Sequence, residues 1–167
     1  MKDFPDIPEG RILNGIGGTI GQYDVIDEIA GLLPNNQPAM DSFWIDFPGS
    51  RGWAFVWNAV DQMLAKCQQR NVGANLGLVL IPQGSDVKIA AGQYDAELIA
   101  LGEKLKTSGV PILLRIGNEL NVPGFGCTKG LFPEAYRCIV DRIDAAASAD
   151  NVRYVWCVLP EASQPTV

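Results

Sequence analysis

The segment PILLRIGNELNVPGFG (residues 111–126) joins an apolar run to a polar pair. The run at 112–114 leads through Arg115 to Asn118 and Glu119, and a loop of Pro, Gly and Phe follows. Such a run is typical of a buried strand. The carboxyl ends of parallel strands are where α/β folds place ligands. The segment therefore predicts an amide and a carboxylate at the rim of a ligand site.

Arg115 and Glu119 have a purely structural interpretation as a buried ion pair that ends the strand. An ionised carboxylate beside an apolar strand is costly unless it is paired. In the functional interpretation, partial desolvation raises the pKa of the Glu, which can then hold a proton to donate. A nearby Arg favours the anion instead. The distance between Arg115 and Glu119 therefore decides which protonation state Glu119 adopts. The Asn118 amide can bind a sugar hydroxyl. Glycosidic bond cleavage needs an acid that protonates the leaving oxygen, and Glu119 could supply it while the Asn118 amide orients the sugar.

The same alternation of apolar runs and amphipathic segments continues along the chain. Strands are expected at 11–17, 38–47, 73–81, 111–117 and 152–159. Helices are expected at 23–33, 53–70, 94–106 and 133–147. The order βαβαβαβαβ with short connections predicts an α/β protein with a parallel sheet. Five strands and four helices are fewer than an eight-stranded barrel of ~250 residues needs.

The composition excludes several classes of function. With 167 residues, 47% hydrophobic and 19% charged, the chain is expected to form a single domain over residues 1–167. A net charge of −6 argues against a nucleic-acid partner, and no apolar run approaches the ~20 residues of a membrane span. The absence of histidine removes Ser-His-Asp and Cys-His mechanisms and the commonest zinc sites. Acid–base chemistry near neutral pH is left to carboxylates, Tyr, Lys or Cys.

The four cysteines show no CxxC spacing, so no metal site is expected at Cys67, Cys127, Cys138 and Cys157. A disulfide between Cys127 and Cys138 stays open, and buried free thiols are the simpler interpretation. The first ten residues, MKDFPDIPEG, contain no apolar signal core. The chain is therefore expected to be cytoplasmic, or mature after processing, or excised from a larger protein.

Two further motifs place glycine or aromatic residues at expected strand ends. GIGGTIG (residues 15–21) has Ile20 where a GxGxxG pattern needs glycine, so a glycine-rich turn is favoured over phosphate binding. SFWIDFPGSRGW (residues 42–53) is rich in aromatic residues, which usually pack in a core. Trp44 and Phe47 are three residues apart and so face opposite sides of a strand. An exposed Trp at a strand end is a natural platform for the apolar face of a sugar ring.

Two stretches carry a resemblance to a known family, namely AGQYDAELIALGEKLKTSGVPILLRIGNELN (residues 91–121) and FPEAYRCIVDRIDAAASADNVRYVWCVLPEAS (residues 132–163). They resemble the middle of a clan A glycoside hydrolase and are most similar to the family 26 β-mannanases. The similarity runs in order over residues 12–163 and is specific at 94–156. It implies a (β/α)8 TIM barrel, of which this chain would hold a partial barrel that stops after the fifth strand.

The resemblance also implies a retaining mechanism on a β-linked polysaccharide, with mannan favoured. Glu119 matches the family's acid/base at the end of the fourth strand, and Asn118 matches a clan Asn that contacts the sugar 2-hydroxyl. Family 26 itself usually has His at that position, so at Asn118 this chain matches the pattern of the wider clan and not that of family 26. Arg115 is expected to set the polarity of the site, and Trp44 and Trp156 are expected to contact sugar. No metal and no organic cofactor are implied, and an extracellular or periplasmic location is favoured.

The family's nucleophile is a Glu at the end of the seventh strand, beyond the fifth strand where this chain is expected to end. Asp41, Asp46 and Glu161 are candidate substitutes, although neither Asp46 nor Glu161 matches the family's position. We therefore expect little or no hydrolysis from this chain alone. Unpaired edge strands predict a homodimer, a complementing partner chain or a compact rearrangement. The alternatives are a non-catalytic carbohydrate-binding or scaffold protein and an unrelated α/β domain that binds a small molecule.

Overall fold

The computed structural model describes residues 15–17, 27–29, 31–32, 38–117, 131–146 and 150–157. The strands within these ranges are β1 (Gly15–Gly17), β2 (Met40–Phe47), β3 (Gly73–Leu80), β4 (Ile112–Ile116) and β5 (Val152–Trp156). The helices are α2 (Trp53–Arg70), α3 (Ser85–Ala90), α4 (Asp95–Thr107) and α5 (Phe132–Ala146). None of these helices is both long and apolar enough to cross a bilayer.

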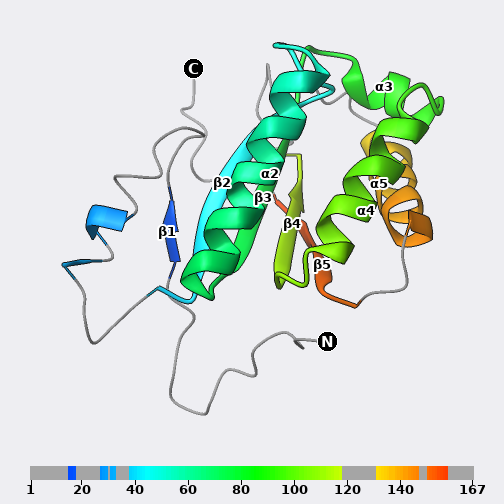
Figure 1. Cartoon of the computed structure of the whole chain (residues 1–167). Helices are drawn as coiled ribbons and strands as arrows, with labels where there is room; N and C mark the ends of the chain where they lie inside the picture. Colours follow the sequence, from blue (N-terminus) through cyan, green and yellow to red (C-terminus); the bar gives the residue numbers. More distant parts are fainter. Residues whose placement is uncertain are drawn as a thin grey trace, which may run out of the picture.

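All five strands are parallel and lie in one sheet in chain order, β1-β2-β3-β4-β5 (Figure 1). This confirms the predicted parallel α/β sheet and the predicted sites of its strands. Of the helix expected at 23–33, residues 27–29 and 31 are helical, residue 32 lies in a turn, and the other positions lie outside the described residues. Helix α3 was not predicted, because its six residues are too few to show helical periodicity in the sequence.

The two faces of the sheet differ in what covers them. Successive side chains of a strand point to opposite faces, and paired residues of neighbouring strands share a face. One face carries Phe43, which pairs with Leu76, and Leu76 pairs with Leu114. These residues form one hydrophobic core with the buried side chains of α2, α4 and α5. In Figure 1, α2 accordingly lies across β2 and β3.

The opposite face carries the row Trp44, Gly77, Arg115 and Val155, which are paired across β2, β3, β4 and β5. None of these four residues belongs to the core that the helices share with the sheet. We call this side of the sheet the helix-free face, because no helix of the described ranges packs on it. The described helices therefore contribute no core packing to this face, on which Met40 and Val79 are nevertheless buried.

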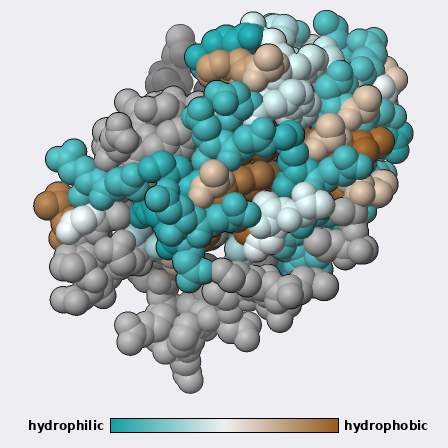
Figure 2. Space-filling model, viewed as in Figure 1, coloured by the Kyte–Doolittle hydropathy of each residue, from teal (hydrophilic) through white to brown (hydrophobic). Residues whose placement is uncertain are grey.

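The helices follow the amphipathic patterns expected for them. In α4, Leu98, Leu101 and Leu105 are buried, as predicted from their spacing. Helix α2 ends at Arg70, where Asn71 adopts a left-handed conformation with φ 56°. The outer surface of the helical layer is largely hydrophilic, as Figure 2 shows. The buried side chains of α2, α4 and α5 thus belong to one core with the sheet.

Helices α4 and α5 approach each other closely at Gly102. A Cβ added there would lie 2.8 Å from Ala146 Cβ and 2.9 Å from the Ile143 carbonyl oxygen. Glycine in a helix interior costs about 1 kcal/mol of helix propensity relative to alanine. The close packing explains why this position carries a glycine.

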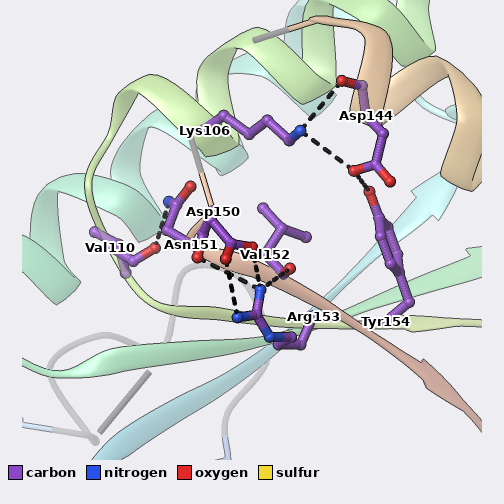
Figure 3. A network of polar contacts seen from close by, with 8 residues as sticks. All are labelled: Lys106, Val110, Asp144, Asp150, Asn151, Val152, Arg153 and Tyr154. Carbon is purple, nitrogen blue, oxygen red and sulfur yellow. Dashed lines mark hydrogen bonds and ion pairs between the residues drawn. The ribbon is translucent and has the colours of Figure 1, made fainter. Parts of the chain in front are cut away.

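A polar network joins α4, α5 and β5 near the start of β5 (Figure 3). Lys106 is only 7% exposed, and its Nζ lies 3.2 Å from Asp144 Oδ1. Tyr154 donates its hydroxyl to the same oxygen at 2.6 Å, and burial, followed by this hydrogen bond, raises the pKa of Tyr154. Asn151 donates to the Val110 carbonyl oxygen at 2.7 Å. These bonds tie the last strand to the helical layer, at the strand end opposite the expected ligand site.

Candidate functional site

The candidate site lies on the helix-free face, toward the carboxyl ends of the strands. Trp44 is 37% exposed there, whereas Phe47 is fully buried in the core on the other face. This confirms that Trp44 and Phe47 face opposite sides of their strand. Gly77 separates Trp44 from Arg115 and contributes no side chain. Glycine inside a strand often marks a place where a ligand or another backbone approaches closely.

The turn after β2 positions the polar groups beside Trp44. Gly49 donates its N–H to the Asp46 carbonyl oxygen, and Gly52 donates to the Gly49 carbonyl oxygen, both at 3.0 Å. Gly49 has φ 73°, and a Cβ there would lie 3.0 Å from Val56 Cγ2, so this position requires glycine. The turn brings Ser50 Oγ to 2.6 Å from Asp46 Oδ2, where it donates a hydrogen bond. The local sequence thus fixes the orientation of the Asp46 carboxylate.

A pocket of about 90 Å³ opens between the end of β2 and the start of α2. Trp44, Asp46 and Arg51 are among the residues that line it. The Arg51 guanidinium carbon lies 4.0 Å from the centre of the Phe55 ring, a cation–π contact that restrains it. The full lining is Trp44, Ile45, Asp46, Gly49, Ser50, Arg51, Phe55 and Val56.

Arg115 is half-buried in the middle of β4. Its Nε is buried and makes no hydrogen bond, and no carboxylate of the described residues forms an ion pair with it. A buried donor without a partner costs about 1–3 kcal/mol. Asn118 and Glu119, which follow it in sequence, lie outside the described residues. The predicted pairing of Arg115 with Glu119 and the roles of Glu119 and Asn118 therefore stay predictions.

Trp156 does not share the face that carries Trp44 and Arg115. It pairs with Ile116 on the helix-covered face and packs against Phe132 and Tyr136, each with ring centres 4.9 Å away. It is nevertheless 48% exposed. The structure thus places Trp44 and Arg115 in one row on the same face, on either side of β3, and places Trp156 on the other side of the sheet.

The candidate replacement carboxylates occupy different environments. Asp41 lies at the start of β2 on the helix-covered face, 1% exposed, with its Oδ2 2.8 Å from Arg70 Nη1. Burial raises the pKa of Asp41, and Arg70 only partly opposes this. Asp41 is therefore a structural residue rather than part of the site. Asp46 is the one carboxylate on the helix-free face of the described strands, and Glu161 lies outside the described residues.

The thiols that the structure describes are free. Cys138 is unpaired, and its Sγ lies 3.3 Å from the Ile89 carbonyl oxygen. Cys67 is fully buried, which raises its pKa to about 12, while Cys157 is half-buried. The other member of the considered disulfide, Cys127, lies outside the described residues. Within the described ranges, no cluster of Cys, Asp and Glu could hold a metal ion.

Sequence reasoning found Trp44, Arg115 and Asp46 but missed Ser50 and Arg51. Both lie in the short connection GSRG between β2 and α2. Connections at the carboxyl ends of parallel strands carry functional side chains disproportionately, which was the available signal. Their contacts with Asp46 and Phe55 depend on the turn geometry, which a sequence pattern does not specify.

Comparison with known proteins supports the fold. The chain is similar to the solved structure of the Podospora anserina GH26-CBM35 β-(1,4)-mannanase, with a TM-score of 0.62 and 13% identity. The match covers 93% of this chain and 42% of the mannanase chain, so this chain spans less than half of that protein. No protein-family model and no curated protein matches the sequence. At this level of identity the similarity establishes a shared parallel α/β architecture, not a shared activity.

Proposed function

We propose that this chain is a partial (β/α)8 unit of a glycoside hydrolase-like protein, folded as a single domain, that binds a β-linked polysaccharide on its helix-free face. Mannan is the favoured substrate, which rests on the fold similarity to a mannanase. The observation that carries the proposal is the row formed by Trp44, Gly77 and Arg115. It supplies an exposed aromatic platform and a half-buried guanidinium on one face of the sheet, and Asn118 and Glu119 follow the strand of Arg115 in sequence.

In the proposed mechanism, Glu119 is the general acid/base that protonates the leaving glycosidic oxygen. Asn118 orients a sugar hydroxyl, and Arg115 adjusts the charge balance near Glu119 by favouring its anion. Retaining hydrolysis needs a second carboxyl group at about 5–5.5 Å that acts as the nucleophile. The proposal assigns no residue of this chain to that role, so the chain alone is expected to hydrolyse little or nothing.

Substitution of Glu119 tests the acid/base assignment. Wild type, Glu119→Gln and a control, Glu103→Gln on the exposed side of α4, are assayed for reducing-end release from mannan and from a β-glucan. Removing a general acid lowers the rate by about 10²–10⁴. Because wild type is itself expected to release little, we expect Glu119→Gln to abolish whatever release wild type shows and the control to keep it, with oligosaccharide affinity retained in both. Hydrolysis that is unchanged in Glu119→Gln contradicts the assignment.

The second candidate is a carbohydrate-binding protein without catalysis. It is favoured by the presence of a single carboxylate, Asp46, on the helix-free face of the described strands, with one oxygen already held by Ser50. This candidate predicts saturable oligosaccharide binding without reducing-end release, and with Glu119→Gln binding as wild type does. Both functions predict binding in the titration, so the hydrolysis assay separates them: only the first predicts a weak release of reducing ends that Glu119→Gln abolishes.

A further inference from the structure

We infer that the polysaccharide bound on the helix-free face is acidic, with a sugar carboxylate that pairs with Arg115. The inference rests on the proposed function and names the chemical class of its ligand. Its basis is the environment of the Arg115 guanidinium, which differs from that of the other arginines in the described ranges.

Arg115 is a half-buried cation without a counter-ion among the described residues. Its Nε is buried without a hydrogen bond, and no described carboxylate forms an ion pair with it. The exposed Arg51 lies over the Phe55 ring instead. The remaining described arginines each lie beside a carboxylate, in the pairs Arg70–Asp41, Arg137–Glu134, Arg142–Asp95 and Arg153–Asp150. Because a guanidinium keeps its charge in proteins, Arg115 is a partly desolvated charge that an external anion can neutralise.

The described strands do not supply that anion on the helix-free face. Asp46 is the one carboxylate there, and it pairs with Val79 of β3. Arg115 pairs with Gly77, two residues earlier on β3, and forms no ion pair with Asp46. Asp46 accepts the hydroxyl of Ser50 instead, at 2.6 Å. The position beside Arg115, which is Gly77, adds no side chain that competes for the guanidinium.

A uronic acid suits Arg115 better than a neutral sugar does. A sugar hydroxyl can accept a hydrogen bond from the guanidinium, but it leaves the charge uncompensated. A carboxylate accepts two parallel N–H bonds from a guanidinium and also neutralises its charge. Trp44, on the other side of Gly77, is exposed and can pack against the apolar face of the same chain. A β-linked polymer of uronic acids offers both features.

An acidic ligand also fits the proposed mechanism. Glu119 must carry a proton in order to donate it, whereas the cationic Arg115 favours the Glu119 anion. A ligand carboxylate that neutralises Arg115 removes this effect. The acidic ligand would therefore help Glu119 to act as the acid.

The test compares the β-1,4-linked tetrasaccharides of mannose and of mannuronic acid by calorimetric titration. The sugars differ only at C6, which is a hydroxymethyl group in mannose and a carboxylate in mannuronic acid. For wild type we expect the mannuronate tetrasaccharide to bind about tenfold more tightly or better, equivalent to about 1.4 kcal/mol. Arg115→Gln keeps an amide donor without the charge, and we expect it to bind both sugars equally or to favour mannose.

Arg137→Gln is the matched control, because it removes the same charge from an exposed position on α5. We expect it to keep the preference for mannuronate. Circular dichroism verifies the fold of each variant. If Arg115→Gln does not fold, Arg115→Lys replaces it. Since an ammonium cannot form the bidentate pair, Arg115→Lys is expected to weaken mannuronate binding and to leave mannose binding unchanged.

The outcomes separate this inference from the proposed function. Equal affinities in wild type, or tighter binding of mannose, overturn the acidic ligand and leave sugar binding intact. A preference for mannuronate that survives in the Arg115 variant, or that Arg137→Gln removes equally, also overturns it. The absence of binding for both sugars overturns the inference and the proposed function together. A preference that is lost at Arg115 and kept in the control supports the inference, and binding of mannuronate alone would also replace mannan as the favoured ligand.

Discussion

Trp44 and Arg115 are both paired with Gly77, so they flank a position without a side chain on the helix-free face of the sheet. Trp44 is substantially exposed, and the Arg115 Nε is buried without a hydrogen bond. An aromatic ring can contact the apolar face of a sugar, and an unsatisfied donor can bind a sugar oxygen, so the two groups on either side of a glycine suit a sugar ligand. This relationship, rather than any single residue, is the basis of the proposed function.

Filling the position between Trp44 and Arg115 is expected to impair binding. Gly77→Val adds a branched side chain to the helix-free face, and we expect affinity for the mannose tetrasaccharide to fall about tenfold or more. The control is Asn75→Val, two residues earlier on the same face and beside Ser42. Titration measures the affinity, and circular dichroism verifies the fold. Unchanged affinity in a folded Gly77→Val protein argues against binding at this row.

Replacing Gly102 with alanine is expected to destabilise the protein, whereas the same change in a helix usually stabilises it. Alanine in place of glycine ordinarily stabilises a helix by about 1 kcal/mol. Here the added Cβ would clash with Ile143 and Ala146 of α5, so we expect Gly102→Ala to lower the free energy of unfolding by about 1–3 kcal/mol. Urea denaturation measures the change. Gly31→Ala is the matched control, because its added Cβ meets no atom within 4 Å. A stabilised Gly102→Ala protein is inconsistent with the close approach of α4 and α5.

Asp41 is expected to make stability fall as the pH rises. Burial raises its pKa, so the folded state binds the proton more tightly than the unfolded state does. The stabilisation linked to that proton is fully present below the unfolded pKa and is lost as pH rises through the folded pKa. Asp41→Asn should therefore lose less stability than wild type as the pH rises above 3.8, the ordinary value of the Asp pKa.

Asp150 provides a control, because its expected effect on the pH dependence of stability is opposite to that of Asp41. Its hydrogen bond to Arg153 lowers the pKa of Asp150, so its contribution is present above the unfolded pKa and is lost as pH falls. Asp150→Asn should accordingly reduce sensitivity to acid. Denaturation midpoints across the pH range measure both variants. Identical pH profiles for Asp41→Asn and wild type would show that folding leaves the proton affinity of Asp41 unchanged.

The thiols of Cys67, which is fully buried, and Cys138, which is half-buried, are expected to react slowly while the protein is folded. Burial raises the pKa of Cys67 to about 12 and also raises the pKa of Cys138, and the thiolate is the reactive form. In a Cys127→Ser/Cys157→Ser background, only these two thiols remain to be labelled. We expect labelling at neutral pH to be slow in buffer and rapid in denaturant. Rapid labelling of both thiols without denaturant would contradict the packing around them.

Much of the fold was predictable because its signals are local. The apolar runs that became β2, β3 and β4, and the apolar stripe of α4, can each be identified within a few residues of sequence. The opposite orientations of Trp44 and Phe47 follow from strand alternation alone. The parallel order of the strands followed from the alternation of strand and helix signals.

The site was less predictable because it depends on register. Trp44 and Arg115 share a row only because β2, β3 and β4 are aligned at Gly77, and a shift of one residue would move either side chain to the other face. Register also explains why Trp156 lies on the helix-covered face, because its pairing with Ile116 turns it toward α5. The contact of Ser50 with Asp46 requires the glycine turn geometry, which the sequence motif does not specify.

The most direct measurement of the central claim is tryptophan fluorescence during titration with the mannose tetrasaccharide. Trp44 and Trp156 are exposed on opposite faces of the sheet, while Trp53 and Trp57 are half-buried and stacked on each other. The account predicts a saturable change in wild type that is lost in Trp44→Phe and kept in Trp156→Phe. A change that persists in Trp44→Phe and disappears in Trp156→Phe, or no change in wild type, would contradict sugar binding on the helix-free face.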